Sequence, residues 1–191
     1  NAASVEFANT KIGFCGSFGL RIESVYPSNK PMSVVINNTT IENNGGGGAV
    51  LIGPINVQAL NSKFLNNAQV GFWCNDIATT QNLFFKCVVS QTYGAKNAAK
   101  ELGHGFCLVG NGSISVGLSQ FVDNEGYGIA LQGPVGLSLS GSSVSQNKFG
   151  IGTFEGAQFT LSSSVVTGNT EDDFSSDAVL PVPGPPQIPP E

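Results

Sequence analysis

The residues best suited to acid–base chemistry are few in this sequence and lie far apart. The chain has one histidine, His104, which stands between two glycines, and one arginine, Arg21. Hydrolysis of a sugar needs a pair of carboxyl groups, one as acid and one as base. The adjacent acids Asp172 and Asp173 are distant from His104 along the chain. His104 is therefore only a weak catalytic candidate, and we expect no catalytic centre.

The cysteines do not have the spacing of metal ligands. Cys15, Cys74, Cys87 and Cys107 form no CxxC pair. This argues against zinc, and we expect neither a metal nor a cofactor. Four cysteines in 191 residues permit disulfides but do not make a disulfide scaffold. The sequons at Asn37, Asn38 and Asn111 are compatible with secretion.

The composition excludes several classes of protein. Only 11% of the residues are charged, and the eight Lys and Arg residues are scattered along the chain. Without a basic stripe, a nucleic-acid partner is not expected. No apolar run approaches the roughly 18 residues that span a membrane. The chain begins with Asn, and without a recognisable signal peptide we interpret it as a mature or excised segment.

Asn-rich turns recur at a nearly constant interval. The last Asn of each turn falls at Asn44, Asn67, Asn124, Asn147 and Asn169, with steps of 23 (67−44), 23 (147−124) and 22 (169−147). Between Asn67 and Asn124 we place one more turn, with Gln91 in the Asn position and an insertion at Thr92–Leu102. A degenerate first coil begins near Val5. Turns in register can stack their Asn side chains into a hydrogen-bonded ladder, so "NNGGGG" at 43–48 is a tight turn rather than a linker.

Short alternating segments lie between these turns. Residues 55–60 (INVQAL) and 135–140 (VGLSLS) alternate apolar with polar residues, which is typical of strands. Three such strands in each repeat predict a parallel solenoid whose coils bury one continuous core.

The repeat pattern h-x-N-N-x-G-x-G-h-x-L-x-G-P-h-x-h resembles the pectin-lyase-like superfamily, and in particular the short repeats shared by carbohydrate-binding proteins and sugar hydrolases. The likeness runs roughly from Val5 to Phe174. It implies an all-β, right-handed parallel β-helix of about seven coils of roughly 22–24 residues, with the Asn ladder between the second and third strands of each coil. The domain would comprise residues 1–174, with the insertion at 92–102, followed by a Pro-rich tail or linker at 175–191. The resemblance implies a fold more firmly than an activity.

Enzymes of this superfamily generally place their chemistry on the outward face of the first strands. In this sequence we expect only amides and hydroxyls there, which can bind sugars by hydrogen bonds but cannot supply acid–base catalysis. The candidate glycan contacts are Asn56, Gln58, Asn82, Ser115, Ser138 and Thr160. The "GHG" at Gly103–Gly105 matches polygalacturonases, whose Asp pair and Arg-x-Lys motif have no counterpart here. The alternative is that His104 joins Val70, Tyr127 and Phe149 in a stacked row at a corner.

The outward positions of the third strands are predicted to be apolar. They are Val50, Ile52, Trp73, Cys107, Val109 and Phe154. Such a strip needs a cover. We favour the insertion packing over Trp73 and Cys107, and the other candidates are the tail, another domain or a partner chain. As a partner interface the strip would comprise Val50, Ile52, Trp73, Val109 and Phe154.

The same register assigns each cysteine to a face of the coil. Cys74 is expected to face inward and Cys107 outward, and Cys87 is expected on the outward side of a second strand. Because no two of them come within bonding distance, we expect reduced thiols.

The function that fits these features best is a non-catalytic domain outside the cell or on its surface, serving as a rigid spacer, assembly or adhesion element. Its partners would be a polysaccharide or glycan, a second copy of the chain, or flanking domains of a longer protein. A polysaccharide lyase or glycoside hydrolase is the main alternative, and an intracellular repeat scaffold is the third.

Overall fold

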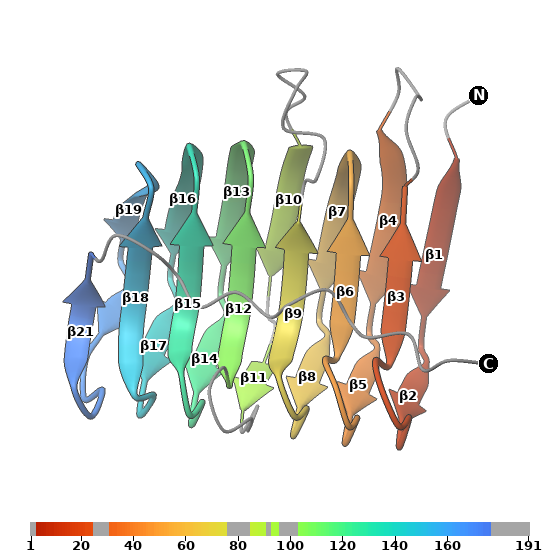
Figure 1. Cartoon of the computed structure of the whole chain (residues 1–191), viewed down its shortest axis with the longest axis horizontal. Helices are drawn as coiled ribbons and strands as arrows, with labels where there is room; N and C mark the ends of the chain where they lie inside the picture. Colours follow the sequence, from red (N-terminus) through yellow and green to blue (C-terminus); the bar gives the residue numbers. More distant parts are fainter. Residues whose placement is uncertain (1–2, 25–30, 76–84, 91–92, 96–102, 177–191) are drawn as a thin grey trace.

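The chain folds into stacked coils of three short strands each (Figure 1). The computed structural model describes residues 3–24, 31–75, 85–90, 93–95 and 103–176, which contain 21 strands and no helix. Every third strand pairs in parallel, which gives three sheets of seven strands. The prediction of an all-β parallel β-helix is confirmed.

The bounds of the strands show the repeat. The first sheet contains β1 (Ser4–Ala8), β4 (Met32–Asn37), β7 (Ile55–Leu60), β10 (Phe85–Ser90), β13 (Gly112–Gly117), β16 (Val135–Ser140) and β19 (Gln158–Ser162). The second contains β2 (Lys11–Gly13), β5 (Thr40–Glu42), β8 (Lys63–Leu65), β11 (Tyr93–Ala95), β14 (Gln120–Val122), β17 (Ser143–Ser145) and β20 (Val165–Val166). The third contains β3 (Leu20–Glu23), β6 (Ala49–Ile52), β9 (Val70–Asn75), β12 (His104–Val109), β15 (Tyr127–Gln132), β18 (Phe149–Phe154) and β21 (Asp172–Ser175).

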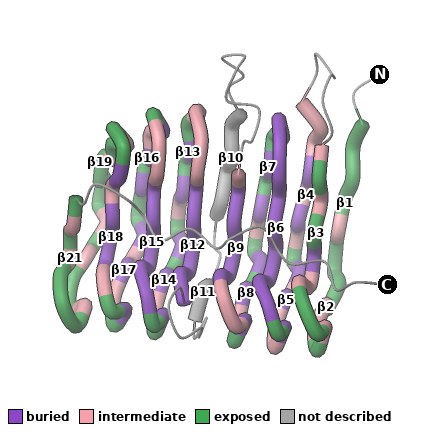
Figure 2. The backbone as a smooth tube through the Cα atoms, viewed as in Figure 1, coloured by how far each residue is buried: buried purple, intermediate pink, exposed green. Residues whose placement is uncertain are grey.

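The core runs through the middle of all the coils. Alternate residues of each strand point inward, so β7 reads buried–exposed from Ile55 to Ala59. One inward row of the third sheet places Ala49, Phe72, Phe106 and Ile129 in register on neighbouring strands. The buried residues in Figure 2 form this continuous core, and exposed residues gather at the two end coils.

The Asn ladder lies between the second and third strands, as predicted. Asn44 Nδ2 donates to Asn67 Oδ1 at 2.8 Å, and Asn124 Nδ2 donates to Asn147 Oδ1 at 2.8 Å. Asn147 Nδ2 continues to Asn169 Oδ1 at 3.0 Å. Each Oδ1 also accepts a backbone N–H from the neighbouring turn, as Asn147 Oδ1 does from Asn124 at 3.1 Å. The ladder therefore satisfies buried turn groups that water cannot reach.

The left-handed residue of each turn is the one before the ladder Asn. Asn43, Asn66, Asp123 and Gln146 have φ between 51° and 58°. The four glycines at 45–48 are required for a different reason, because neighbouring coils approach closely there. A Cβ on Gly45 would lie 2.6 Å from the carbonyl oxygen of Gly16 in the preceding coil. Close backbone approach, rather than positive φ, requires these glycines.

A second ladder, of hydroxyl groups, was not predicted. It lies between the first and second strands, directly after a residue with positive φ such as Asn38 or Asn61. Ser62 Oγ accepts the backbone N–H of Thr39 at 3.2 Å, and Ser142 Oγ accepts that of Ser119 at 3.0 Å. The sequence signal is a Ser or Thr two positions after every first strand, at Thr10, Thr39, Ser62, Thr92, Ser119, Ser142 and Ser164.

The coil between Asn67 and Asn124 differs from the prediction. β11 (Tyr93–Ala95) pairs with β8 and β14, so residues assigned to the insertion at 92–102 form a second strand. Asn67 lies two residues after β8, and the equivalent position after β11 is 97 rather than Gln91. The extra residues are divided instead between the β9–β10 and β11–β12 connections. The error arose because the Asn position was matched without a strand register.

The same correction applies to Cys87. It lies on β10, a first strand, and pairs in register with the inward positions Val57 and Ile114 rather than beside Lys63 on a second strand. Cys74 and Cys107 occupy the predicted inward and outward positions, and both are free, as is Cys15. The predicted tail at 175–191 lies almost wholly outside the described residues, and the last described strand ends at Ser175.

Candidate functional site

The outward face of the first sheet carries the predicted glycan contacts. Gln58, Ser115, Ser138 and Thr160 occupy one register row, and β10 contributes Val88 to the same row. All four of these polar residues are exposed, as is Asn56 in the adjacent row. Strand pairing spaces such positions by about 4.8 Å. The row therefore presents three hydroxyl groups on successive strands, with one amide two strands away beyond Val88. Such groups suit hydrogen bonding to a polyhydroxyl chain.

The ionisable content of this face was predicted wrongly. Because β10 begins at Phe85, its outward register positions are Lys86 and Val88, and not Thr80 and Asn82. Asn82 lies outside the described residues. Lys86 shares a row with Ser113. Glu6 and Val35 continue the row of Gln58 toward the first coil. The face is thus polar and mostly uncharged, with one cationic and one anionic register position on separate coils.

His104 belongs to a different sheet and is buried. It begins β12 and is 2% exposed. Its Nδ1 accepts the backbone N–H of Tyr127 at 3.1 Å, so in the neutral ring the proton is on Nε2.

The predicted stacked row around His104 is present. His104 pairs in register with Val70, and Tyr127 pairs with Phe149. The rings of His104 and Tyr127 are 5.4 Å apart, and those of Tyr127 and Phe149 are 4.7 Å apart and nearly parallel. Lys148 Nζ lies 5.3 Å from the centre of the Phe149 ring. The row supplies packing on the outside of the third sheet.

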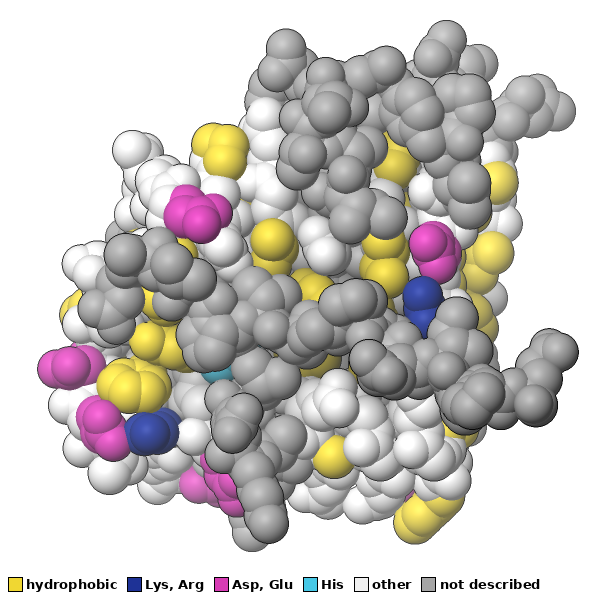
Figure 3. Space-filling view, in the orientation of Figure 1, with side chains coloured by type: hydrophobic (Ala, Val, Ile, Leu, Met, Phe, Trp, Pro, Cys, Tyr) yellow, Lys and Arg dark blue, Asp and Glu magenta, His cyan; other side chains and the backbone are white. Residues whose placement is uncertain are grey.

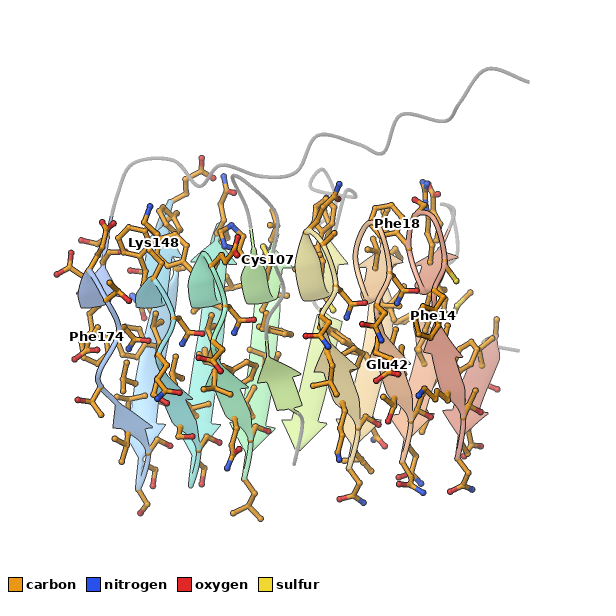
Figure 4. The ribbon with its side chains drawn as sticks, turned by 90° about the horizontal axis from the view of Figure 1, so that it is seen from below. Phe14, Phe18, Glu42, Cys107, Lys148 and Phe174 are labelled. Carbon is orange, nitrogen blue, oxygen red and sulfur yellow. The ribbon has the colours of Figure 1, made fainter. Side chains whose placement is uncertain are left out.

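The acidic candidates lie near the last coil and have structural partners. Asp173 Oδ1 accepts from Asn169 Nδ2 at 2.7 Å, and Lys148 Nζ pairs with Glu171 Oε1 at 3.5 Å. Arg21 pairs with Glu23 at 3.2 Å at the opposite end. Figure 4 shows Lys148 close to the end that Phe174 marks, with Phe14 at the other end. Within the described ranges, no group of three or more His, Cys, Asp or Glu is placed to hold a metal ion.

A shallow groove that the sequence did not reveal runs beside the Asn ladder. Its volume is about 610 Å³, and it is lined by Asp123, Asn124, Glu125, Gln146, Lys148, Thr170 and Glu171. These residues come from three successive turns, so only the stacking brings them together. The mixed charge suits a polar contact surface rather than a reaction centre.

The apolar strip lies on the outward face of the third sheet, as predicted. We call this surface the outer apolar face and define it by Val50, Ile52, Val70, Trp73, Cys107, Tyr127, Ala130 and Phe154. These eight residues are all buried, and Val109 packs against them. Burial, and next the nearby Cys74, raise the pKa of the Cys107 thiol above its usual range. Figure 3 shows hydrophobic side chains on this side of the molecule, with Asp, Glu, Lys and Arg side chains toward both ends of the stack.

Two polar atoms on the outer apolar face stand out in the described part of the chain. Trp73 Nε1 and Gln132 Oε1 are buried and have no hydrogen-bond partner. A buried indole N–H without an acceptor costs about 1–3 kcal/mol. The face is therefore built to contact something that offers polar groups as well as apolar surface.

The stacked strands and the two ladders define a parallel β-helix. Residues 1–133 match the model of a family described as the right-handed β-helix region, and the chain belongs to this family. No curated protein and no solved structure matches the chain. Across the described ranges, no helix has the length and apolar character required to cross a membrane.

Proposed function

We propose that this chain is a non-catalytic β-helix domain that acts outside the cell or on its surface as a structural or adhesion module and binds glycans through the first sheet. The observation that carries the proposal is the exposed register row of Gln58, Ser115, Ser138 and Thr160. Amides and hydroxyls at strand spacing can donate to and accept from sugar hydroxyls, but they do not titrate near neutral pH.

The ends of the stack support a role within a larger assembly. Val5 and Phe14 are exposed on the first coil, and Leu161, Val165 and Phe174 are exposed on the last. Apolar groups and unpaired strand edges at the end of a solenoid favour contact with a neighbouring domain or chain. The exposed sequon residue Asn38 is compatible with the proposed location.

The test of the glycan proposal is a binding assay against a panel of neutral and acidic polysaccharides. The triple variant Gln58→Ala, Ser115→Ala, Ser138→Ala should lose about tenfold or more in affinity, because about 1.4 kcal/mol of lost hydrogen bonding is a factor of ten. The matched control is Gln120→Ala, an exposed residue of the second sheet, which should bind as the wild type does. Equal binding by all three proteins would exclude the first sheet as the contact.

One observation favours the alternative of a polysaccharide-active enzyme. Lys86 pairs in register with Ser113 of the first sheet, and lysine is a residue type that can serve as a base. The same panel should therefore be assayed for release of reducing ends, with Lys86→Ala and His104→Ala as controls. We expect no release. Release that either substitution abolishes would replace the binding proposal with an enzymatic one.

A further inference from the structure

The outward faces of the first and third sheets differ in how far their side chains are exposed, although both are faces of similar parallel sheets. On the first sheet, Gln58 and Ser138 are exposed, whereas on the third sheet Val50 and Cys107 are 0% and 1% exposed. Both pairs point away from the core of the coil. All described strands belong to the three sheets, so none of them lies over the outer apolar face.

We propose that the Pro-rich segment 177–191 of this chain docks along the outer apolar face as an extended, polyproline-like strap. Residues 178–190, AVLPVPGPPQIPP, contain six prolines and no charged residue. A segment of this composition favours the polyproline II conformation, which aromatic-lined apolar grooves recognise.

The place where the described chain ends fits this occupant. β21 is the edge strand of the third sheet, so the described chain ends, at residue 176, beside the outer apolar face. Ser175 shares a register row with Gly152 and Ala130 on that face. Its Oγ donates to the hydroxyl of Tyr127, a member of the face, at 3.2 Å. The chain is thus already attached to the face where the segment begins.

The chain length fits as well. The face extends from β6 to β18, which at about 4.8 Å per strand is about 19 Å. At about 3.1 Å per residue, a polyproline segment 177–191 spans about 46 Å. By contrast, residues 96–102 lie between β11 and β12, so this segment must turn back to β12. At about 3.5 Å per residue, it can extend only about 12 Å from β12 before it turns back. The face extends to both sides of β12.

The polar chemistry of the face also suits a proline-rich occupant. Trp73 Nε1 is a donor without an acceptor, and Gln132 Oε1 is an acceptor without a donor. Proline residues present carbonyl oxygens and no N–H, so a Pro-rich backbone has free acceptors for an indole N–H. The few non-proline residues of the segment, such as Gly184 and Gln187, retain the donors that Gln132 requires.

The first experiment compares the full chain with a full-length variant in which residues 177–191 are replaced by Gly and Ser. Trp73 is the only tryptophan, and Cys107 is its register neighbour on the same face. In the variant we expect a red shift of Trp73 emission and alkylation of Cys107 faster by about tenfold or more, because labelling of a protected thiol follows the fraction of time that its site is open. Cys74 lies on the core side of the same sheet and is the internal control. Its protection should not change, and a peptide of residues 177–191 added in trans should restore that of Cys107.

The second experiment does not depend on the variant folding. A photo-crosslinking amino acid at position 73 of the full chain should capture a peptide within 177–191, identified by mass spectrometry. Unchanged labelling of Cys107 in the Gly/Ser variant would overturn the proposal. So would a crosslink that falls only on residues 76–84 or 96–102, or only on a second copy of the chain.

Discussion

The side chain of Asn169 ends the ladder by donating to Asp173 Oδ1 at 2.7 Å within its own coil. By contrast, each hydrogen bond between two Asn residues of the ladder joins neighbouring coils, as the one from Asn147 to Asn169 does. A carboxylate accepts hydrogen bonds but has no proton to pass on. Asp173 therefore closes the row that the sequence repeat sets up, and it lies on β21, the edge of the third sheet.

Removing this closing acceptor should loosen the last coil. Asp173→Ala removes the acceptor of the Asn169 backbone N–H, at 3.3 Å, and of its side-chain N–H, at 2.7 Å, and we expect a loss of about 1–2 kcal/mol. Asp173→Asn keeps an acceptor oxygen and should lose less. Hydrogen exchange of peptides from β20 and β21 measures the effect locally, because end coils of a solenoid can open without the rest. Equal exchange in the two variants would contradict an acceptor role.

A glycine pair tests how closely the coils pack. A Cβ on Gly128 would lie 2.6 Å from Asn147 Nδ2 of the next coil, whereas a Cβ on Gly136 has no heavy atom within 4 Å. We expect Gly128→Ala to cost about 1–3 kcal/mol by overpacking. Gly136→Ala should be neutral or slightly stabilising, because it only restricts the unfolded chain. Urea unfolding followed by Trp73 fluorescence measures both, and similar midpoints would contradict the packing argument.

The hydroxyl ladder predicts an unequal effect of two nearby serines. Ser142 Oγ accepts from the backbone of Ser119 at 3.0 Å and donates to the carbonyl of Ser140 at 2.9 Å. Ser142→Ala removes this acceptor of the Ser119 backbone N–H, whereas the Ser140 carbonyl still accepts from Leu118 at 2.9 Å, and we expect a loss of about 1–3 kcal/mol. The side chain of Ser140 is exposed, so Ser140→Ala should change stability by less than about 0.5 kcal/mol. The ladder is unimportant if thermal melting gives the two variants the same stability.

The free cysteines of the described residues should differ in how fast an alkylating reagent modifies them. The pKa of Cys107 is raised by burial, so the folded protein keeps this thiol protonated where a free thiol would ionise. The half-buried Cys15 should be alkylated first, and Cys107 much more slowly, whenever its site opens.

The same shift affects stability at high pH. The contribution of Cys107 is complete below the unfolded pKa of about 8.5, and above it falls by up to about 1.4 kcal/mol per pH unit as the unfolded thiol ionises. Urea unfolding between pH 7 and pH 10 measures this loss. Cys107→Ala is the control, and its stability should depend less on pH. An unchanged slope in that variant would mean that other groups cause the loss.

The features that repeat were the ones that could be predicted. Asn44, Asn147 and the alternation of β7 and β16 recur in register, so the stacking and the faces follow from them. The coil around Gln91 was placed wrongly because extra residues broke the interval, and the strand register there depends on pairing with β8 and β14. Lys86 was missed for the same reason. The groove beside Lys148 and Glu171 combines three turns and has no signal within any one of them.

The ladder also has an electrical direction. Asn44, Asn124 and Asn147 each direct their amide N–H toward the later coil. Aligned amide groups add their dipoles, as peptide groups do along a helix. The positive end of this row lies at β21, where the Asp173 carboxylate accepts from its last N–H. The row of side-chain amides is thus polarised along the axis of the stack, and a carboxylate lies at its positive end, as an acidic residue does at the start of a helix.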